Sequence, residues 1–221
     1  MPVGVLTGTR RIRLNVWILR VAAAAAVLVA STACVPIATP STDSSASPGE
    51  SHARLAALTV APAGSMRGYA RSRFPTWRET GSNCNVRDEV LKRDGTKVKT
   101  SGCNVVAGTW TSAYDGKVLD APAKVEIDHL VPLADAWRSG ASSWTDARRE
   151  DFANDLDRPE LAAVSTAANR AKGDQDPSTW RPQRTGEWCD YAGDWIAVKA
   201  HWRLTVTRAE KAALADMLGW C

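Results

Sequence analysis

The clearest candidate for chemistry is a carboxylate next to an imidazole, in the segment Glu126-Ile127-Asp128-His129-Leu130-Val131-Pro132. Histidine is scarce: the chain has only His52, His129 and His201. An imidazole titrates close to neutral pH, which suits it to take up and release a proton in catalysis. A structural interpretation is also open at this point, because a partly buried histidine often pairs with an aspartate simply to satisfy its ring nitrogens.

The elements around this segment are expected to bring a third polar side chain near it. Residues 125–131 have the pattern of a strand closed by a proline, and residues 161–164 are a second short strand candidate. A serine N-cap and a terminating glycine predict a helix over residues 165–172, which carries Asn169 forty residues after His129. Neighbouring side chains on a strand point to opposite faces, so the carboxylate and imidazole diverge unless the strand twists or ends there.

Motifs for other common chemistries are missing from the sequence. There is no HxH or HExxH pair for a zinc site, no GxSxG turn for a serine hydrolase and no phosphate-binding P-loop. The strand, strand, helix pattern is therefore the main clue.

Three stretches carry a resemblance to a known family. They are Ile127-Asp128-His129-Leu130-Val131-Pro132-Leu133, Phe152-Ala153-Asn154-Asp155-Leu156, and Asn169-Arg170-Ala171-Lys172-Gly173-Asp174-Gln175-Asp176-Pro177 with Trp180. Together they resemble the HNH endonucleases with their ββα-metal (His-Me) finger, and most closely the secreted members related to the C-terminal domain of GmrSD-type restriction enzymes. A DH dipeptide alone is weak evidence, whereas DHxxP followed by an NxxKGD helix is fairly specific. A looser likeness extends from Tyr69 to Cys221.

The resemblance implies a nuclease that depends on a divalent metal ion, with Mg²⁺ as the expected ion and Mn²⁺ as the alternative. Hydrolysis of a phosphodiester needs a base for water, a cation for the phosphate charge and help for the departing oxygen. His129 would be the base. Asp128 and Asn169 would hold the metal through one anionic and one neutral oxygen, which leaves room for water and phosphate. No organic cofactor is expected.

Further roles follow from the resemblance with less support from the residues. Asn154 corresponds to the middle residue of the HNH name, which supports the loop and orients the base, although it could equally be a helix C-terminal asparagine. Lys172 and Arg170 could contact phosphate or simply be solvated helix charges. Glu126 lies two residues before Asp128 and could be an additional ligand. Many family members have a final histidine where this chain has an asparagine, a difference that we expect to alter metal preference more than mechanism.

The expected substrate is DNA, or RNA, cut with low sequence specificity because backbone chemistry requires no reading of bases. Family behaviour suggests 3′-hydroxyl and 5′-phosphate ends. One alternative is a non-catalytic, secreted or envelope-anchored binding module that retains the HNH fold. A second alternative is a glycosidase that uses a pair of carboxylates. The chain has 24 acidic residues that could supply the pair, but it contains no motif of such an enzyme.

The first 34 residues have the layout of an export signal. They contain four arginines and no acid, followed by the apolar run Val21–Ala30 and the small residues Ser31-Thr32-Ala33. Removing those four arginines from the 28 basic residues leaves 24, which equals the number of acidic residues, so any contact of the mature protein with nucleic acid must be local. The segment Thr9–Leu14 also resembles a twin-arginine signal, which leaves the export route open.

Cysteine usage fits an exported protein. Cys34 follows the small residues of the leader, where it is either next to a plain cleavage site or the attachment point of a membrane-anchoring lipid. The other four cysteines allow three disulfide pairings, and short loops close with the smallest entropy loss, which favours Cys84–Cys103 and Cys189–Cys221. Metal binding by these cysteines is the weaker interpretation, because there is no CxxC.

The rest of the chain predicts an α+β domain over residues 66–221: a ββα-metal core with an N-terminal hairpin and C-terminal helices, stapled by disulfides. Residues 35–65 are rich in Ser, Thr, Pro and Ala and are expected to be a flexible tether.

The hairpin is predicted over residues 96–107 with its turn at Ser101-Gly102, and further helices over residues 87–93, 133–138 and 146–156. In the tail, aromatic and aliphatic residues recur every three or four positions, which predicts a helix with one buried face. That face would be formed by Trp188, Tyr191, Trp195, Val198 and Trp202. Thr207 and Glu210 are expected to cap a last helix.

Overall fold

The computed structural model describes residues 47–221. The predicted leader, Cys34 and the first part of the predicted tether, residues 35–46, lie outside the described residues.

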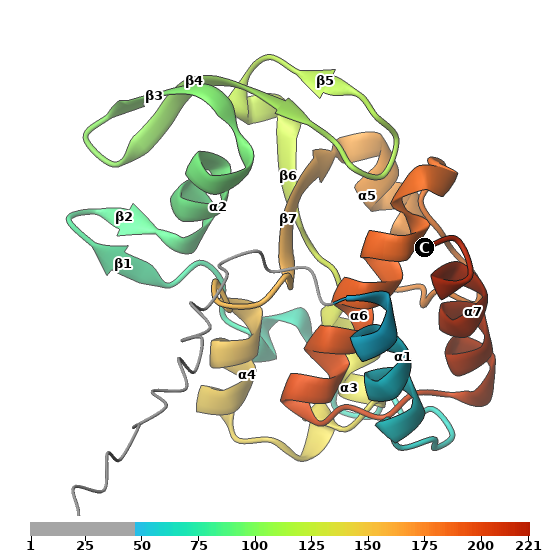
Figure 1. The fold of residues 1–221 in the computed structure, drawn as a ribbon. Helices are drawn as coiled ribbons and strands as arrows, with labels where there is room; N and C mark the ends of the chain where they lie inside the picture. The colour runs from blue at the N-terminus through green and yellow to red at the C-terminus, as the bar shows by residue number, and fades with distance from the viewer. Residues whose placement is uncertain (1–46) are drawn as a thin grey trace, which may run out of the picture. The chain divides into compact units, whose positions relative to one another are not determined.

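The described part of the chain is a mixed α/β fold with three small antiparallel sheets, of which β6–β7 lies among the helices while β1–β2 and β3–β4 lie at one edge beside α2 (Figure 1). The strands are β1 (Glu79–Gly81), β2 (Cys84–Asn85), β3 (Thr96–Ser101), β4 (Asn104–Thr111), β5 (Val118–Leu119), β6 (Val125–His129) and β7 (Leu161–Ser165). The helices are α1 (Pro48–Ala57), α2 (Val86–Asp94), α3 (Leu133–Arg138), α4 (Asp146–Ala153), α5 (Thr166–Lys172), α6 (Trp188–Trp202) and α7 (Arg208–Leu218), with 3-10 turns at Arg71–Arg73, Pro122–Lys124, Ala141–Ser143 and Thr185–Glu187.

The two-stranded sheet β6–β7 contributes side chains to two hydrophobic clusters. Ile127 and Ala163, which pair across the strands, belong to a cluster with α2 and β4. Val164, the next residue on β7, belongs instead to the larger cluster with α3, α4, α6 and α7. Because side chains alternate along a strand, this short sheet is buried on both faces.

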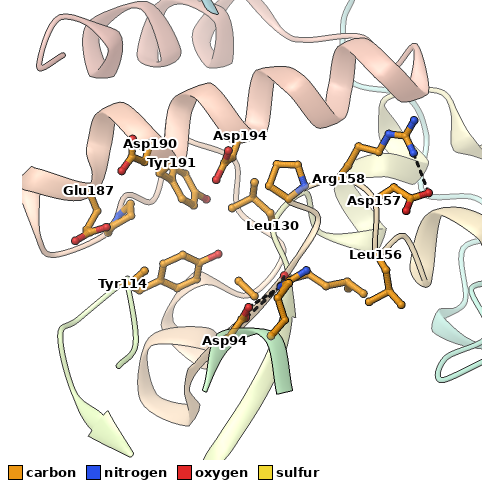
Figure 2. A pocket seen from close by; sticks show the side chains of 16 residues that line it. Asp94, Tyr114, Leu130, Leu156, Asp157, Arg158, Glu187, Asp190, Tyr191 and Asp194 are labelled. Carbon is orange, nitrogen blue, oxygen red and sulfur yellow. Dashed lines mark hydrogen bonds and ion pairs between the residues drawn. The ribbon is translucent and has the colours of Figure 1, made fainter. Parts of the chain in front are cut away.

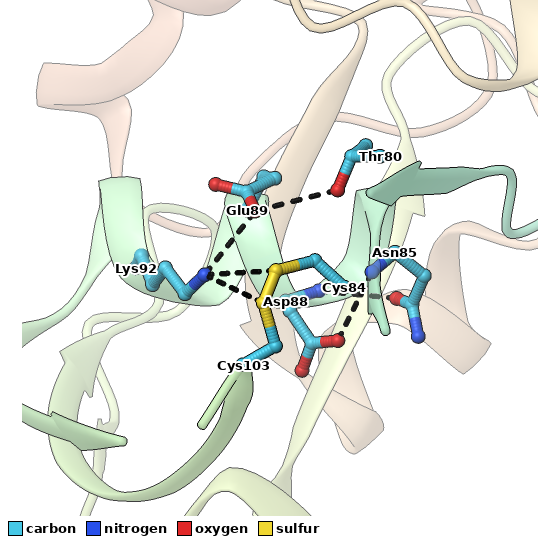
Figure 3. Close-up of a disulfide and its surroundings, with 7 residues drawn as sticks. All are labelled: Thr80, Cys84, Asn85, Asp88, Glu89, Lys92 and Cys103. Atoms are coloured by element: carbon cyan, nitrogen blue, oxygen red, sulfur yellow. Dashed lines mark hydrogen bonds and ion pairs between the residues drawn. A yellow bond between two sulfur atoms is a disulfide. The ribbon is translucent and has the colours of Figure 1, made fainter. Parts of the chain in front are cut away.

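The predicted hairpin and the disulfide next to it are both present. β3 and β4 meet at Ser101 and Asn104, and Gly102 in the turn has φ +58°, a conformation that glycine adopts without strain. Cys84 is disulfide-bonded to Cys103, which ties the start of α2 to this turn (Figure 3). The helix predicted over residues 87–93 extends one residue further at each end. At its N-terminus Asn85 and Asp88 form a capping box.

The C-terminal helices follow the prediction. Tyr191, Trp195 and Val198 on α6 are buried, while Trp188 and Trp202 pack at the edge of the same cluster. The predicted capping box at the start of α7 is present, and the predicted second disulfide joins Cys189 to Cys221.

Two predicted elements are shorter in the structure. The strand predicted over residues 125–131 ends at His129, because the amides of Leu130 and Val131 bond to Glu160, one to its backbone oxygen at 2.6 Å and one to its Oε2 at 3.1 Å. The helix predicted over residues 146–156 ends at Ala153, with Asn154 as its C-cap.

The prediction of a flexible tether through residue 65 is wrong for its second half. Residues 48–57 form α1, which begins with a proline after Ser47, whose hydroxyl accepts a hydrogen bond from the amide of Glu50. Leu55 and Leu58 are buried in the larger cluster, where α1 packs against α6 and α7. Composition averaged over the segment concealed these two leucines, whose burial offsets the ordering entropy of a short helix.

Among residues 47–221, no helix combines the length and the apolar character that crossing a membrane would require.

Candidate active site at the end of β6

A pocket of about 270 Å³ lies at the C-terminal end of β6. Asp128 and His129 both line it, and α5 contributes Asn169 and Arg170 to the same pocket. Arg71, from a 3-10 turn nearly sixty residues earlier, closes another part of the wall. The structure therefore brings Asp128, His129 and Asn169 to one cavity. Both Asp128 and His129 are paired with β7, and the groups that contact the His129 ring, Trp77 and the carbonyl of Ala153, do not line the cavity.

Asp128 is a buried carboxylate held by two donors. Its Oδ2 accepts from the hydroxyl of Tyr114 at 2.7 Å and lies 2.8 Å from the ammonium of Lys172. Burial raises the pKa of Asp128, while the charge and hydrogen bond of Lys172 act in the opposite direction. Among the described residues no donor bonds to Oδ1, so this oxygen is available for another ligand.

Lys172 does not contact the solvent, so neither of the two roles left open for it, phosphate contact or a solvated helix charge, fits the structure. The side chain is 0% exposed, and its ammonium also donates to the backbone oxygen of His129 at 2.9 Å. Residues on the inner face of α5 point to the strands, and the sequence alone did not distinguish this face from the solvated one. The lysine instead neutralises Asp128 and fixes the end of β6.

His129 is buried with one ring nitrogen occupied. Its Nε2 lies 3.0 Å from the carbonyl oxygen of Ala153, which can only accept, so Nε2 carries the proton and Nδ1 keeps its lone pair. The ring stacks on Trp77, with centroids 5.7 Å apart and planes within 8°. Burial lowers the pKa of His129 to about 3, and the nearby charges of Arg71 and Lys172 act in the same direction. The imidazole is thus neutral at physiological pH with a lone pair on Nδ1, but burial makes it a weaker base than the ordinary imidazole from which its role was expected.

Asn154 lies behind the histidine and does not line the pocket. Its Oδ1 accepts from the amide of Arg78 at 2.8 Å, and its Nδ2 donates to the carbonyl oxygens of Pro75 and Glu150, also at 2.8 Å. The amide thereby holds the loop that carries Trp77 against His129. This geometry fits a loop-supporting role, and Asn154 is also the C-cap of α4, as the alternative interpretation expected. Both of its side-chain polar atoms are bonded within the protein.

Asn169 and Glu126 are hydrogen-bonded to each other and do not both point to the pocket as separate candidate metal ligands. Nδ2 of Asn169 donates to Oε2 of Glu126 at 2.8 Å, and Glu126 is not among the residues that line the pocket. Arg170 lies 3.9 Å from the other oxygen of Glu126 and is 79% exposed on its side chain. Because the nitrogen of the amide is occupied, its oxygen is the atom left for a ligand in the pocket.

The donor set fits a hard divalent cation. Oδ1 of Asp128 and Oδ1 of Asn169 are both oxygens, one charged and one neutral, and Mg²⁺ prefers such ligands while keeping several waters. Among residues 47–221, two other clusters of acidic or cysteine side chains are close enough together to share an ion, and neither lies at this pocket. One includes the disulfide Cys84–Cys103, and the other surrounds the ammonium of Lys199, which already supplies a positive charge.

Sequence reasoning missed several residues of this site. Tyr114 donates to Asp128, Trp77 stacks on His129, and Tyr69 and Arg71 line the pocket, yet none of them belongs to a motif or lies near the DHxxP segment in sequence. The only available signal was a run of arginines at positions 67, 71 and 73 in a chain of otherwise balanced charge.

Comparison with known proteins places this arrangement in a family. Residues 84–217 match the family model described as GmrSD restriction endonucleases, C-terminal domain. A protein of Arthroderma benhamiae described as an uncharacterized secreted protein is 48% identical over 187 residues, which are 84% of this chain and 91% of the relative. No solved structure matches. Since the family model covers more than half of the chain and includes all three stretches of the DHxxP and NxxKGD pattern, the protein belongs to the family of the C-terminal domain of GmrSD restriction endonucleases.

Proposed function

We propose that this protein is an exported, divalent-metal-dependent endonuclease that hydrolyses phosphodiester bonds of DNA with low sequence specificity. RNA is the alternative substrate. The observation that carries the proposal is the shared pocket of Asp128, His129 and Asn169. The His129 imidazole keeps a free ring nitrogen, and one oxygen of Asp128 and the amide oxygen of Asn169 have no donor among the described residues. In this proposal β6, β7 and α5 form the ββα-metal finger, and membership of the GmrSD C-terminal family supports the nuclease activity.

Asp128 and Asn169 would hold the ion, which when bound would neutralise charge on the phosphate and assist the departing oxygen. Nδ1 of His129 accepts the proton of the attacking water, because Nε2 is committed to Ala153. Trp77 and the carbonyl of Ala153 fix the ring plane, so the lone pair keeps one direction.

Arg71 and Arg170 are the residues that we assign to the phosphate backbone. Both are exposed at the pocket that contains His129, and guanidinium groups bind phosphate oxygens in a bidentate manner. Contacts to the backbone carry no base information, which supports low sequence specificity.

Export is proposed from the leader-like residues 1–34 and from the two disulfides, which persist outside the cytosol. The secreted relative from Arthroderma benhamiae supports the same location. Mass spectrometry of the mature N-terminus would show whether Cys34 is present and carries a lipid.

The deciding experiment is plasmid nicking by the mature protein with Mg²⁺ or Mn²⁺, with and without a chelator. We expect cleavage by the wild type, loss by at least about a hundredfold in His129→Ala, and none with chelator. His201→Ala is the matched control, since His201 is exposed on α6 away from the pocket and should leave activity unchanged.

Equal cleavage by wild type and His129→Ala would reject the mechanism. DNA binding without cleavage under either metal would favour the alternative, a non-catalytic module that retains the fold.

A further inference from the structure

The loop of residues 112–117, between β4 and β5, contacts both elements that carry a candidate metal ligand. Asp128 lies on β6 and Asn169 on α5, and the two adjacent loop residues Tyr114 and Asp115 reach one of these elements each. Neither loop residue lines the pocket at the end of β6, so both act on the site only through other residues. The proposed mechanism assigns this loop no role.

Tyr114 holds the carboxylate of Asp128. Its hydroxyl donates to Oδ2 at 2.7 Å, and both side chains are buried. The phenol ring is itself fixed, because it packs edge-on against Trp180 and Tyr191, with centroids 5.1 and 5.6 Å away. The backbone oxygen of Tyr114 also accepts from the amide of Gln183 at 2.9 Å. A donor that cannot move restricts the orientation of the carboxylate it bonds.

The neighbouring tyrosine does not share this contact. Tyr114 and Tyr191 both line a second and larger pocket, of about 470 Å³, where Figure 2 shows Tyr191 extending from α6 and Tyr114 lying opposite it. None of Asp128, His129 or Asn169 lines this pocket. Among residues 47–221 the hydroxyl of Tyr191 has no hydrogen-bond partner. Of these two packed phenols, only Tyr114 is therefore bonded to a candidate metal ligand.

Asp115 holds the start of α5. Its Oδ2 accepts from the hydroxyl of Ser165 at 2.7 Å, and the same hydroxyl accepts from the amide of Ala168 at 3.1 Å as the N-cap of the helix. The Asp115 side chain is 4% exposed, and its Oδ2 lies 3.3 Å from the ammonium of Lys117. Because the Ser165 hydroxyl donates and accepts at once, it fixes the first turn of α5 to the loop, one residue before Asn169.

The two contacts together constrain where the two candidate ligands lie. Mg²⁺ requires oxygen ligands close to octahedral positions, so ligands on two separate elements bind it well only if those elements are held in a fixed relation. We propose that Tyr114 and Asp115 are positioning residues, and that the loop sets the separation of Asp128 and Asn169 for a divalent ion by holding β6 and α5 together. This role rests on the proposed function, because it presupposes an ion at these two ligands.

Isothermal titration of the mature protein with Mn²⁺ alone measures this role without relying on cleavage. Tyr114→Phe should bind Mn²⁺ about tenfold or more weakly than the wild type, because it removes only the hydroxyl that holds Asp128. Tyr191→Phe is the matched control. It removes a hydroxyl without a hydrogen-bond partner from the neighbouring ring, and should bind Mn²⁺ like the wild type.

Two substitutions of Asp115 separate its geometry from its charge. Asp115→Ala should weaken Mn²⁺ binding about tenfold, because the Ser165 hydroxyl loses its acceptor. Asp115→Asn keeps a side-chain oxygen for that hydroxyl and should stay within about threefold of the wild type. Asp120→Ala, which removes an exposed carboxylate paired with Lys124, should have no effect. Thermal unfolding identifies a temperature at which every variant is folded, and all titrations are made below it.

Equal Mn²⁺ affinity of the wild type, Tyr114→Phe and Asp115→Ala would overturn the positioning role and leave the metal site standing. Asp115→Asn binding as weakly as Asp115→Ala would also overturn it, because charge and not position would then be responsible. The same holds if Tyr191→Phe loses as much affinity as Tyr114→Phe, since ring packing would then explain the loss. No Mn²⁺ binding by the wild type would instead reject the proposed metal site, and the positioning role with it.

Discussion

At the scale of single residues, the pair of Asp128 and Lys172 determines the state of the candidate metal site. Both side chains are buried, and the lysine also holds the backbone at His129. A buried carboxylate without a cation is strongly unfavourable, and the ammonium opposes the rise in the pKa of Asp128 that burial causes. The lysine contacts only Oδ2, so in the proposed site the other carboxylate oxygen would remain for a metal ion and Lys172 would be a positioning residue.

Lys172→Met should therefore destabilise the protein by about 3–5 kcal/mol, because it leaves Asp128 buried without its partner. Arg170→Met is the control on the same helix: Arg170 is largely exposed, and its loss should change stability by less than about 0.5 kcal/mol. Urea unfolding at neutral pH measures both. Equal stability of the two variants would show that the Asp128–Lys172 pair contributes nothing to folding.

Asp194 predicts a pH dependence of stability. Its pKa in the folded protein is about 7, above the ordinary value of 3.8, so the folded state holds a proton that the unfolded state releases. The stabilising contribution of the protonated form is complete below about pH 4 and is lost as pH rises toward 7. The charged groups that act on this carboxylate are Asp190 on the same helix and Arg93 on α2.

Between pH 4.5 and 8 the free energy of unfolding should fall in the wild type more than in Asp194→Asn. The difference between the two falls should be on the order of a few kcal/mol. Urea unfolding at several pH values provides the measurement. Parallel stability curves for wild type and variant would contradict the raised pKa.

Sequence reasoning found candidate site residues through two short motifs. The resemblance of DHxxP and NxxKGD to the HNH pattern singled out Asp128, His129 and Asn169, and these three residues line one pocket. The motifs did not reveal which face of α5 is buried, so they left phosphate contact and a solvated charge open for Lys172, whose side chain is instead fully enclosed. Tyr114 and Trp77 reach the site through tertiary packing, and no local pattern encodes such contacts.

At the scale of elements, caps and turns made the boundaries predictable. The serine cap and glycine stop of α5, the capping box of α7 and the glycine turn of the β3–β4 hairpin all lie where the sequence indicated. These signals are local hydrogen bonds and dihedral preferences. The end of β6 was misplaced by two residues because Glu160, thirty residues later, binds the amides of Leu130 and Val131.

α1 gives the clearest test at this scale. Leu55→Ala should destabilise the protein by about 2–5 kcal/mol, because Leu55 is buried against α6 and α7. His52→Ala is the control on the same helix, where the exposed side chain should contribute less than about 0.5 kcal/mol. If both variants unfold at the same urea concentration as wild type, α1 is not part of the cooperative fold and residues 47–65 behave as the tether that composition suggested.

At the scale of the whole molecule, the balance of charge separates this protein from nucleic-acid-binding proteins that rely on a basic surface. Without the four arginines of residues 1–34 the chain has as many acidic as basic residues, and the larger pocket is lined by five acids. In the proposed nuclease, attraction to DNA would come from a few cations near the smaller pocket, whose wall includes Arg71 and Arg170. Few phosphate contacts release few counterions, so binding should depend only weakly on salt.

We therefore expect the logarithm of the DNA-binding constant to fall with the logarithm of salt concentration with a slope of about −2, for two phosphate contacts. Fluorescence anisotropy of labelled duplex DNA with the His129→Ala protein measures binding without cleavage. Arg71→Ala should make the slope shallower by about one. Arg158→Ala, which removes an arginine from the acidic pocket instead, should leave it unchanged. A wild-type slope steeper than about −5 would mean that an extended basic surface, and not the pocket at the end of β6, dominates binding; the assignment of Arg71 and Arg170 to the phosphate backbone would then fail even if His129 is the base.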